Sequence, residues 1–401
     1  MRVAVVAEWY PSPADPVHGI WAHRQALAAR DAGAEVRVVA MRRPLPPLSA
    51  LRALAGSPPD AAPLRRWARG VRPSMDPWRL DGIEVRSVPF LSPPRPRSYG
   101  SWGHWMAPTL KLALDHMQRR WPFDLLHAHC IVPPGYAAAR WRHGGQGRPP
   151  LVVSAHGPDM IHVPQLSALA GRASRSALRG ADLVLANSRW AERRCREIAG
   201  AELRSRVVHL GADLPAELPR KRERPTLVTV AHLVARKRHA VVLHALAELS
   251  ERLELDYLVI GDGPGRGPLE RLAGELGLGQ RVRFAGQLEH ERALEETARC
   301  HLFVMPGVEE PFGVAFVEAM AAGLPAVGAR GEGGPDDIAA AGGGMLLVAP
   351  DDHRGLAAAI AGAFEGGIEQ LGRQARQNVE RNFTWERCGR ATTAAYEAAL
   401  R

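Results

Sequence analysis

At 401 residues, with 46% hydrophobic and 23% charged residues, the chain has the composition of a folded protein with two domains of about 200 residues each, which excludes wholesale disorder. Its net charge of +10 is uneven, because residues 1–200 hold 28 lysines and arginines against 14 acidic residues, while residues 201–401 hold 24 against 28. The basic first half predicts attraction to anions such as phospholipid, nucleic acid or a phosphorylated substrate.

The first half alternates strand and helix patterns. An apolar run at 2–7 predicts a buried strand, the spacing at 20–33 predicts a helix that ends at a glycine, and 35–40 predicts a second strand. This βαβ unit indicates a parallel, doubly wound sheet. Further strands are predicted at 83–90, 123–129, 150–157, 181–188 and 206–211, and helices at 166–179 and 189–198.

Residues 41–80 interrupt the alternation. They hold eight arginines against Asp60 and Asp76, together with several prolines and two tryptophans. This composition predicts an inserted or flexible loop and not a core element.

A second βα series follows a proline- and charge-rich linker at about 214–225. Two such series indicate two Rossmann-like domains. The predicted strands are 226–233, 255–261, 281–286, 301–307, 325–329 and 344–350, and the predicted helices are 238–252, 266–277, 290–299, 314–322 and 354–364. Because ligands bind outside the carboxyl ends of parallel strands, the segments that follow strands are the candidates for a functional site.

Among these segments, "GVEEPFGVAFVEAMAAGLP" (307–325) places Glu310 before a predicted helix and Glu318 within it. The backbone amides of 312–314 would open this helix and could hold an anion or a ligand oxygen. The two carboxylates also fit the acid and nucleophile of a glycosidase, or a helix cap and a solvated charge. The residues alone leave these alternatives open.

Three cationic or titratable side chains, His232, Arg236 and Lys237, follow the first strand of the second series. Cations at a strand end can neutralise a diphosphate, although an ordinary basic helix start fits these residues equally well. The glycine turn at 261–265 lacks the full spacing of a dinucleotide-binding motif.

In the first half, Gly19 lies at a helix start, where a glycine lets the backbone approach a ligand or simply serves a turn. His156, with Asp159 three residues later, follows a strand and can donate hydrogen bonds to a ligand or be satisfied by backbone. His127 and His129 alternate along a strand and are interpreted as structural.

Several classes of site and location are disfavoured. There is no run of 18 apolar residues, and the apolar stretch before Glu8 and Pro11 is too short for a signal peptide, so we expect a cytoplasmic protein. The four cysteines have no CxxC spacing, and no HExxH motif or acidic cluster occurs. We therefore expect neither a disulfide framework nor a bound metal.

Taken in order, these segments resemble the retaining nucleotide-sugar glycosyltransferases of family 4. The resemblance spans nearly the whole chain, and its most specific part is the order EPFG, EAMA, GLP and GG within residues 305–338. It implies an α/β protein of the GT-B fold, with two Rossmann-like, doubly wound domains facing a central cleft. We expect an N-terminal acceptor-binding domain at 1–213, a donor-binding domain at 214–384, and a C-terminal helix at 385–401 that packs on the N-terminal domain.

The resemblance also implies roles by position in the second domain. Glu310 matches the residue that binds hydroxyls of the donor sugar, and Glu318 matches the one that holds the nucleotide ribose. The amides of Phe312, Gly313 and Val314 would face the donor sugar and its phosphate.

For the remaining positions, Lys237 matches the residue that holds the diphosphate, and Gly19 the glycine whose backbone approaches it. His156 matches the histidine beside the sugar and acceptor, with Asp159 as an acceptor contact. His156, Glu310 and Lys237 are thus the expected catalytic residues.

One position departs from the family pattern. Where the family has GRL ahead of the lysine, this chain has Ala231-His232-Leu233, so His232 replaces a permanent guanidinium. A neutral imidazole would be a weaker clamp on the diphosphate, and Arg236 could compensate.

The implied reaction is hexosyl transfer with retention of anomeric configuration and without a metal. The acceptor would attack from the face of the leaving group, and its proton would pass to the departing phosphate, so no protein nucleophile is needed. The only co-substrate implied is a nucleoside-diphosphate sugar of the UDP or GDP type. The acceptor would be a glycan, a lipid-linked molecule or a small molecule, as in cell-envelope polysaccharide biosynthesis.

Two other kinds of function compete with transfer. A nucleotide-sugar epimerase of the same fold is an alternative, whereas a non-enzymatic nucleic-acid binder is disfavoured by the acidic second half and the lack of a nucleic-acid motif. The basic first half also predicts peripheral contact with the anionic inner face of a membrane. The residues expected there are Arg65, Arg66, Trp67, Arg69, Trp102, Trp105, Arg119, Arg120 and Trp121.

Overall fold

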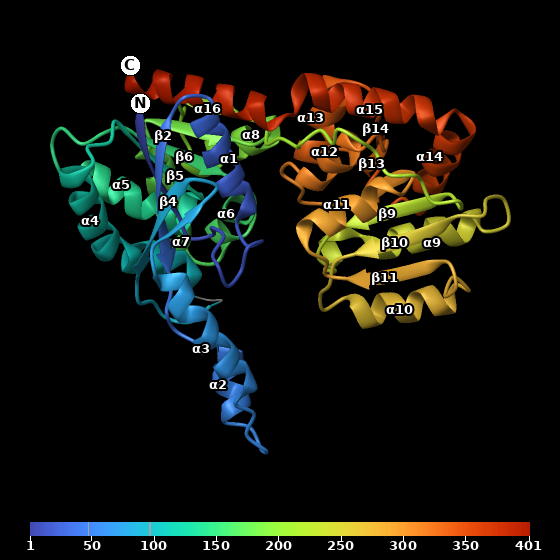
Figure 1. Cartoon of the computed structure of the whole chain (residues 1–401), viewed down its shortest axis with the longest axis horizontal. Coiled ribbons are helices and arrows are strands. Elements are labelled where there is room, and N and C mark those ends of the chain that lie inside the picture. The colour runs from blue at the N-terminus through green and yellow to red at the C-terminus, as the bar shows by residue number, and fades with distance from the viewer. Residues whose placement is uncertain (47, 96–97) are drawn as a thin grey trace. The chain divides into compact units, whose positions relative to one another are not determined.

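The computed structural model describes residues 1–46, 48–95 and 98–401, and the chain divides into two compact units (Figure 1). Unit 1 comprises Met1–Val208 together with Cys388–Arg401, and unit 2 comprises His209–Arg387. The domain boundaries predicted after residues 213 and 384 lie a few residues from these limits.

Among the described residues of unit 1, eight strands form one sheet in the order β3-β4-β2-β1-β5-β6-β7-β8. Neighbouring strands are parallel except for β3, which pairs antiparallel with β4. The strands are β1 (Arg2–Ala7), β2 (Glu35–Arg42), β3 (Trp78–Leu80), β4 (Ile83–Pro89), β5 (Leu125–His129), β6 (Leu151–Ala155), β7 (Leu183–Ala186) and β8 (Ser205–Val207).

The helices of unit 1 lie on both sides of this sheet. They are α1 (Ile20–Asp31), α2 (Leu48–Leu54), α3 (Ala62–Met75), α4 (Trp102–Arg120), α5 (Tyr136–His143), α6 (Pro158–Ile161), α7 (Ala168–Arg179), α8 (Arg189–Ala199) and α16 (Trp385–Leu400). Alternate strand residues such as Val6 and Leu126 share a core with α4, α5, α7 and α8. His127, the residue after Leu126 on β5, points to the opposite side of the sheet and bonds to Tyr396 of α16. Both sides of the sheet are therefore covered, as expected for buried parallel strands.

In residues 209–387, all of which the structure describes, six parallel strands follow the order β11-β10-β9-β12-β13-β14. They are β9 (Thr226–Val230), β10 (Asp256–Ile260), β11 (Val282–Gly286), β12 (Leu302–Met305), β13 (Ala326–Ala329) and β14 (Met345–Val348). The helices are α9 (His239–Leu249), α10 (Arg266–Glu275), α11 (His290–Ala298), α12 (Val314–Ala321), α13 (Gly333–Ala341), α14 (His353–Glu365) and α15 (Ile368–Asn382).

The alternation along β12 shows how unit 2 is layered. Leu302 and Val304 belong to the core that the sheet shares with α9, α10 and α14. Phe303, which points the other way, meets Phe316 of α12 edge-on, with ring centroids 5.3 Å apart. Because β9 and β12 are neighbours, the loops that follow them lie at the same edge of the sheet.

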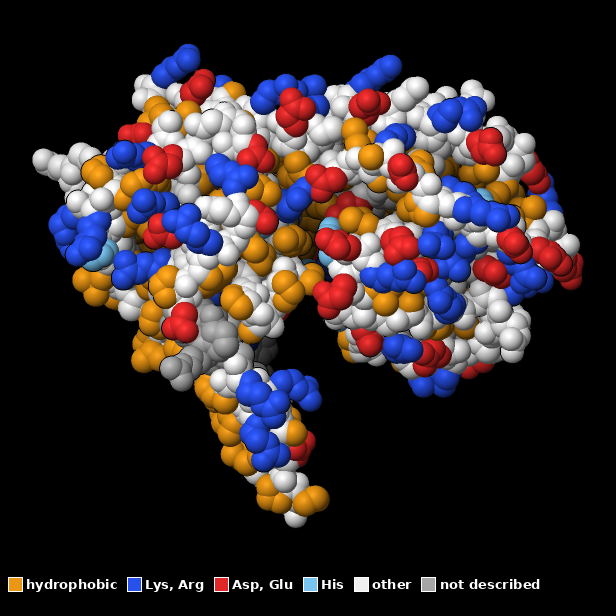
Figure 2. Space-filling view, viewed as in Figure 1, with side chains coloured by type: hydrophobic (Ala, Val, Ile, Leu, Met, Phe, Trp, Pro, Cys, Tyr) orange, Lys and Arg blue, Asp and Glu red, His pale blue; other side chains and the backbone are white. Residues whose placement is uncertain are grey.

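Every strand predicted from a hydrophobic run is present, but the prediction for residues 41–80 was wrong in part. Apart from residue 47, which lies outside the described residues, this segment contains α2, α3 and β3 instead of a single loop. Its exposed arginines include Arg52, Arg65, Arg66 and Arg69. Figure 2 shows basic side chains gathered along the α2–α3 pair, and in this segment they are all arginines. Amphipathic helices with short apolar faces therefore account for a composition that suggested a loop.

Candidate active site

Two loops at the carboxyl ends of β9 and β12 meet in unit 2. The loop after β9 contains a 3₁₀ turn, Ala235–Lys237, and the loop after β12 leads into α12. The Val308 N–H donates to the Arg236 carbonyl at 2.8 Å. A Cβ on Gly307 would lie 3.2 Å from that same carbonyl oxygen, so the small residue allows the two loops to approach closely. The sequence segments that carry Lys237 and Glu310 are thereby held side by side.

Lys237 and Glu310 form a buried ion pair at this junction. The Lys237 ammonium donates to Glu310 Oε2, and both residues are less than one-tenth exposed. The Arg236 guanidinium lies 3.7 Å from the same carboxylate oxygen and donates to the Glu309 carbonyl at 3.3 Å. A buried carboxylate is stabilised only while a cation and further hydrogen bonds accompany it. The structure therefore brings together three of the predicted site residues.

Glu332 supports this pair from the start of α13. Its carboxylate accepts a hydrogen bond from the Glu310 N–H at 3.0 Å, and burial raises the pKa of the Glu332 carboxyl above its ordinary value. A Cβ on Gly334 would lie 1.7 Å from the Phe312 carbonyl oxygen, so only glycine fits where α13 meets this loop. Sequence reasoning did not identify Glu332 as part of the site, although the stretch "GEGG" that holds it was the available signal.

The start of α12 depends on Gly313. Its φ of 78° is in the left-handed region, and a Cβ there would lie 2.7 Å from the Phe316 ring and 3.2 Å from Glu310 Cγ. Phe312 is buried and stacks on His209, with ring centroids 5.8 Å apart. Val314 is the first residue of α12. The predicted loop-to-helix turn is thus fixed by glycine conformation and by aromatic packing.

Glu318 has a different neighbour from Glu310. It lies in the second turn of α12, and its carboxylate is 3.6 Å from the His290 Nε2 at the start of α11. About one-fifth of its side chain is exposed. This ion pair links α12 to α11 and does not involve the Lys237–Glu310 pair.

His232 is exposed at the end of β9, next to the glycine turn 261–265. A Cβ on Gly261 would lie 2.0 Å from the Ala231 carbonyl oxygen, and one on Gly263 would lie 2.7 Å from the Leu233 carbonyl oxygen. These glycines therefore serve the close approach of two loops. His232 Cε1 would be 3.0 Å from the Gly263 Cβ, so its imidazole lies over this turn.

In unit 1, Gly19 precedes α1 with a φ of 81°. A Cβ at this position would lie 2.2 Å from the backbone carbonyl carbon of Trp9. The residue must be glycine because the loop that follows β1 folds directly over the start of α1.

Glu8, at the end of β1, carries a polar and aromatic cluster that the sequence did not reveal. Its carboxylate accepts from Arg95 at 2.5 Å and from the Tyr99 hydroxyl at 2.8 Å. Arg95 lies over the rings of Tyr99 and Trp102, with its Cζ 4.1 and 4.7 Å from the centroids. Burial raises the pKa of the Glu8 carboxyl, against the lowering effect of Arg95. Because these partners are about ninety residues apart in sequence, no local pattern predicts them.

His156 ends a row of three histidines on β5 and β6. His156 Nε2 lies 2.9 Å from His129 Nδ1, and the two rings are stacked 5.1 Å apart. His127, whose ring centroid is 4.4 Å from that of His129, bonds to the Tyr396 hydroxyl and the Ser154 Oγ, each at 2.7 Å. This confirms that His127 is tied into the structure.

Burial keeps this histidine row neutral. Desolvation lowers the pKa of His127 to about 3 and that of His156 to about 4, and it lowers the pKa of His129 well below its ordinary value. Among the described residues, three ring nitrogens near this row are buried and have no hydrogen-bond partner: His156 Nδ1, His129 Nε2 and Trp21 Nε1. Buried polar atoms of this kind are rare in native proteins unless a ligand or water satisfies them.

Asp159 is buried and organises the loop that carries His156. Its carboxylate accepts hydrogen bonds from the N–H groups of Ile131, His156 and Gly157 at 2.9, 3.2 and 2.7 Å. A carboxylate with three backbone donors holds its loop in one conformation. The structure therefore gives Asp159 a positioning role toward His156.

Two tryptophans expected on a membrane-facing surface are not on the surface. Trp102 and Trp121 are buried in unit 1, so the prediction was wrong for both residues, whereas Trp105 is 51% exposed.

In the part of the chain that the structure describes, no helix is long and apolar enough to cross a membrane. Within the same residues, no group of three or more His, Cys, Asp or Glu side chains is arranged to hold a metal ion, and Cys130, Cys195, Cys300 and Cys388 are free thiols.

Comparison with known proteins shows the family. The model of Glycosyltransferase Family 4 matches residues 18–215, and that of Glycosyl transferases group 1 matches residues 212–381. The 2-deoxystreptamine glucosyltransferase of Streptomyces kanamyceticus is 31% identical over 61% of this chain and 69% of its own length. A glycogen synthase of Mycobacterium tuberculosis is 28% identical over 87% of this chain and 89% of its own.

Solved structures show the same fold. Sucrose-phosphate synthase from Thermosynechococcus elongatus aligns with a TM-score of 0.76 at 20% identity, covering 99% of each chain. Anabaena HepE in complex with UDP and glucose aligns with a TM-score of 0.70 at 20% identity, covering 99% of this chain and all of HepE. The chain belongs to the glycosyltransferases of family 4 and has the GT-B fold, as the sequence predicted.

Proposed function

We propose that the protein is a retaining glycosyltransferase that moves a sugar from a nucleoside-diphosphate donor to a glycan, lipid-linked or small-molecule acceptor. The observation that supports this most directly is the buried Lys237–Glu310 pair at the ends of β9 and β12. It offers a cation for a diphosphate next to a carboxylate that can accept hydrogen bonds from sugar hydroxyls. A diphosphate can act as a counter-ion of Lys237, while neutral sugar hydroxyls donate hydrogen bonds to the Glu310 carboxylate, which keeps Arg236 as a nearby cation.

The proposed chemistry needs no protein nucleophile. The bond between the sugar C1 and the diphosphate oxygen breaks, and negative charge develops on the leaving diphosphate. Lys237, Arg236 and the amides of Phe312, Gly313 and Val314 are proposed to stabilise that charge. The acceptor oxygen attacks C1 from the same face, and its proton passes to the departing diphosphate. The reaction then retains the anomeric configuration and uses no metal.

The remaining predicted residues keep their proposed roles, and Asp159, which also holds the loop of His156, stays a proposed acceptor contact. Glu310 binds sugar hydroxyls, Glu318 the ribose, and His232 the diphosphate in place of an arginine. In unit 1, we propose that the neutral His156 hydrogen-bonds the sugar or acceptor through its unpartnered Nδ1, and that Gly19 lets backbone approach the diphosphate. The HepE structures with UDP and UDP-glucose favour UDP as the first nucleotide to test, with GDP next.

Location and acceptor complete the proposal. We propose a cytoplasmic enzyme whose exposed basic helices α2 and α3, together with Trp105, contact an anionic membrane surface. A lipid-linked acceptor, as in cell-envelope polysaccharide biosynthesis, would be presented at such a surface. A nucleotide-sugar epimerase is the alternative, and it would release a changed donor instead of a free nucleotide.

Nucleotide binding and transfer can be tested separately. UDP or GDP should raise the unfolding temperature of the wild-type chain. In a separate assay, the enzyme should release UDP from UDP-glucose or GDP from GDP-mannose when a cell extract that contains candidate acceptors is added. Glu310→Gln should keep the nucleotide-induced stabilisation but lower the release rate about 100-fold or more, because a developing interaction with the sugar is lost. Stabilisation by none of UDP, GDP and ADP, or wild-type release by the variant, would refute the proposal. Proton NMR of the product would give its anomeric configuration.

A further inference from the structure

A polar hollow lies in unit 2, at the opposite edge of the sheet from the Lys237–Glu310 pair. It has a volume of about 340 Å³ and lies near the start of β9, beside β11 and the end of α11. Since the strands are parallel, their starts and their carboxyl ends are on opposite edges of the sheet. The lining residues are Arg220, Lys221, Arg222, Glu223, Arg283, Glu296 and Arg299.

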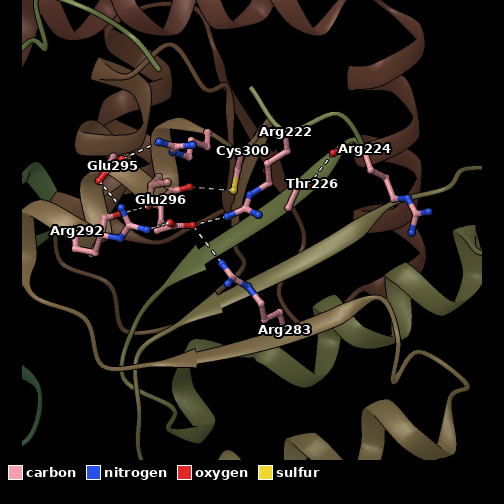
Figure 3. Close-up of polar contacts among 11 residues, drawn as sticks. Arg222, Arg224, Thr226, Arg283, Arg292, Glu295, Glu296 and Cys300 are labelled. Carbon is pink, nitrogen blue, oxygen red and sulfur yellow. Dashed lines mark hydrogen bonds and ion pairs between the residues drawn. The ribbon is translucent and has the colours of Figure 1, made fainter. Parts of the chain in front are cut away.

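Cations outnumber carboxylates around this hollow. The buried Glu296 accepts from Arg222, from Arg283 at 3.2 Å and from Arg292 at 2.6 Å, and Figure 3 shows these three side chains converging on it. Arg292 also donates to the Glu295 carboxylate at 2.6 Å, and Arg299 donates to the same carboxylate at 2.8 Å. Four guanidinium groups thus share two carboxylates, which leaves a local excess of positive charge.

The charged segment 220–224 is fixed on unit 2 and is not a free linker. The Lys221 ammonium donates to the carbonyls of Ala298 and Cys300 at 2.9 and 2.8 Å. The Arg222 N–H donates to the Arg299 carbonyl at 2.9 Å. Burial lowers the pKa of Lys221 to about 8, which leaves it mostly protonated at neutral pH. The cations are therefore positioned before any ligand binds, which reduces the entropic cost of binding.

Two of these arginines have donor atoms without a partner. Among the described residues, Arg222 Nε and Arg299 Nε are buried and make no hydrogen bond. Each guanidinium can present five donors, so both retain capacity for a further acceptor. An oxyanion with several acceptor oxygens would accept hydrogen bonds from the guanidinium groups that line the hollow and would offset the excess positive charge.

A smaller hollow adjoins the first. It has a volume of about 190 Å³ and shares Arg222 and Arg283 with its neighbour. Its other lining residues include Thr226, Asp256, Gln280 and Arg281, which offer hydroxyl, carboxylate, amide and guanidinium groups. A phosphate in the larger hollow could therefore carry a small polar substituent into the smaller one.

We propose that the arginine cluster around Glu296 is a binding site for a phosphate group, either free or as the ester of a small polar metabolite. Planar guanidinium groups match phosphate oxygens in pairs, and four arginines, Arg220, Arg222, Arg283 and Arg299, line the hollow. The site is separate from the proposed donor site, so its occupancy does not depend on the transferase proposal.

Calorimetric titration of the full chain, at constant ionic strength, tests this site. The probes are inorganic phosphate and glucose 6-phosphate. The variant Arg220→Gln/Arg283→Gln removes two exposed arginines of the hollow and leaves Glu296 paired with Arg222 and Arg292, so the fold is retained. The matched control, Arg354→Gln/Arg373→Gln, removes two exposed arginines of unit 2 on α14 and α15. Lys237→Met reports binding at the proposed donor site.

The dissociation constant of each probe should rise about tenfold in Arg220→Gln/Arg283→Gln, because this variant loses two charge-assisted contacts to the phosphate group. The dissociation constants should stay unchanged in Arg354→Gln/Arg373→Gln and in Lys237→Met, which keep both contacts. Tighter binding of glucose 6-phosphate than of phosphate would support an ester, and equal binding would support phosphate alone. No binding of either probe to the wild-type chain, equal binding by all variants, or a loss confined to Lys237→Met would overturn the proposal.

Discussion

The ion pair between Lys237 and Glu310 makes each side chain dependent on the other. Removing one partner leaves a buried charge without its counter-ion, although Arg236 at 3.7 Å offsets part of the loss for Glu310. Removing both leaves two neutral groups of similar volume. The stability of this pair is therefore a sharper test of the local structure than the loss of activity, which either substitution would cause.

Lys237→Met should lower the free energy of unfolding by about 3 kcal/mol, and the double variant Lys237→Met/Glu310→Gln by clearly less. Denaturation with urea at pH 7 measures the free energy of unfolding of Lys237→Met, of Glu310→Gln and of the double variant. If the two substitutions destabilise additively, the pair does not form in solution. Lys237→Met, Glu310→Gln and the double variant should all transfer sugar far more slowly than the wild type under the proposed function.

A second residue-scale prediction concerns pH. The pKa values of His127 and His156 are lowered by burial to about 3 and about 4, whereas an unfolded histidine titrates near about 6.5. Between these values the unfolded chain binds more protons than the native one. The stability that these groups contribute is therefore fully present above pH ~6.5 and is lost as pH falls.

From pH 6.5 to 5, this loss should amount to about 2 kcal/mol per histidine. His127→Gln can still bond to Tyr396 and Ser154 but does not titrate. The free energy of unfolding of this variant should be lower than that of the wild type at pH 7. It should also fall less steeply toward pH 5, because unfolding of the variant takes up as much as one proton fewer than unfolding of the wild type. Chemical denaturation at half-unit pH intervals measures the two slopes. Parallel slopes would show that His127 is not kept neutral in the native state.

At the scale of elements, the turn from β12 into α12 depends on one glycine. Gly313→Ala combines a left-handed backbone with a clash against Phe316 and Glu310, and should cost about 2–4 kcal/mol. Gly277→Ala is the matched control, because Gly277 has a φ of 71° with open space around it, and it should cost about 1 kcal/mol. Thermal unfolding and nucleotide binding compare the two. Equal costs would mean that the turn can move away from the new methyl group.

The same scale shows what a sequence can predict. Buried strands such as β1 and β12 are continuous apolar runs, and their order follows from the alternation with helices, so the parallel sheets were predictable. Helices α2 and α3 were not, because proline and arginine content suggested a loop. The motif order located Lys237 and Glu310. The support from Glu332 and the Arg95–Glu8 contact join residues far apart in sequence, which no local pattern encodes.

For the whole molecule, the chain order of the units matters. Unit 1 also includes residues 388–401, which form most of α16 at the far end of the sequence. Tyr396, Ala395 and Thr392 of this helix are buried. Tyr396 bonds to His127 of β5, and Gln25 of α1 bonds to Thr392 at 3.2 Å. A Cβ on Gly389 would lie 2.1 Å from the Ala28 carbonyl, which shows how closely α16 crosses α1. The predicted C-terminal helix therefore covers a side of the unit 1 sheet that would otherwise be exposed.

This dependence predicts different behaviour for two fragments. Residues 209–387 form one continuous unit with its own core and should unfold cooperatively on their own. Residues 1–208 lack α16, which leaves His127 without Tyr396 and exposes apolar surface on the sheet, so this fragment should show a broad, low-temperature transition. Adding a peptide of residues 385–401 should sharpen that transition and raise its midpoint, whereas the same peptide with Tyr396→Ala and Gly389→Val should not. Circular dichroism on heating measures all of these midpoints. Cooperative unfolding of 1–208 without the peptide would show that α16 is not needed for the core of unit 1.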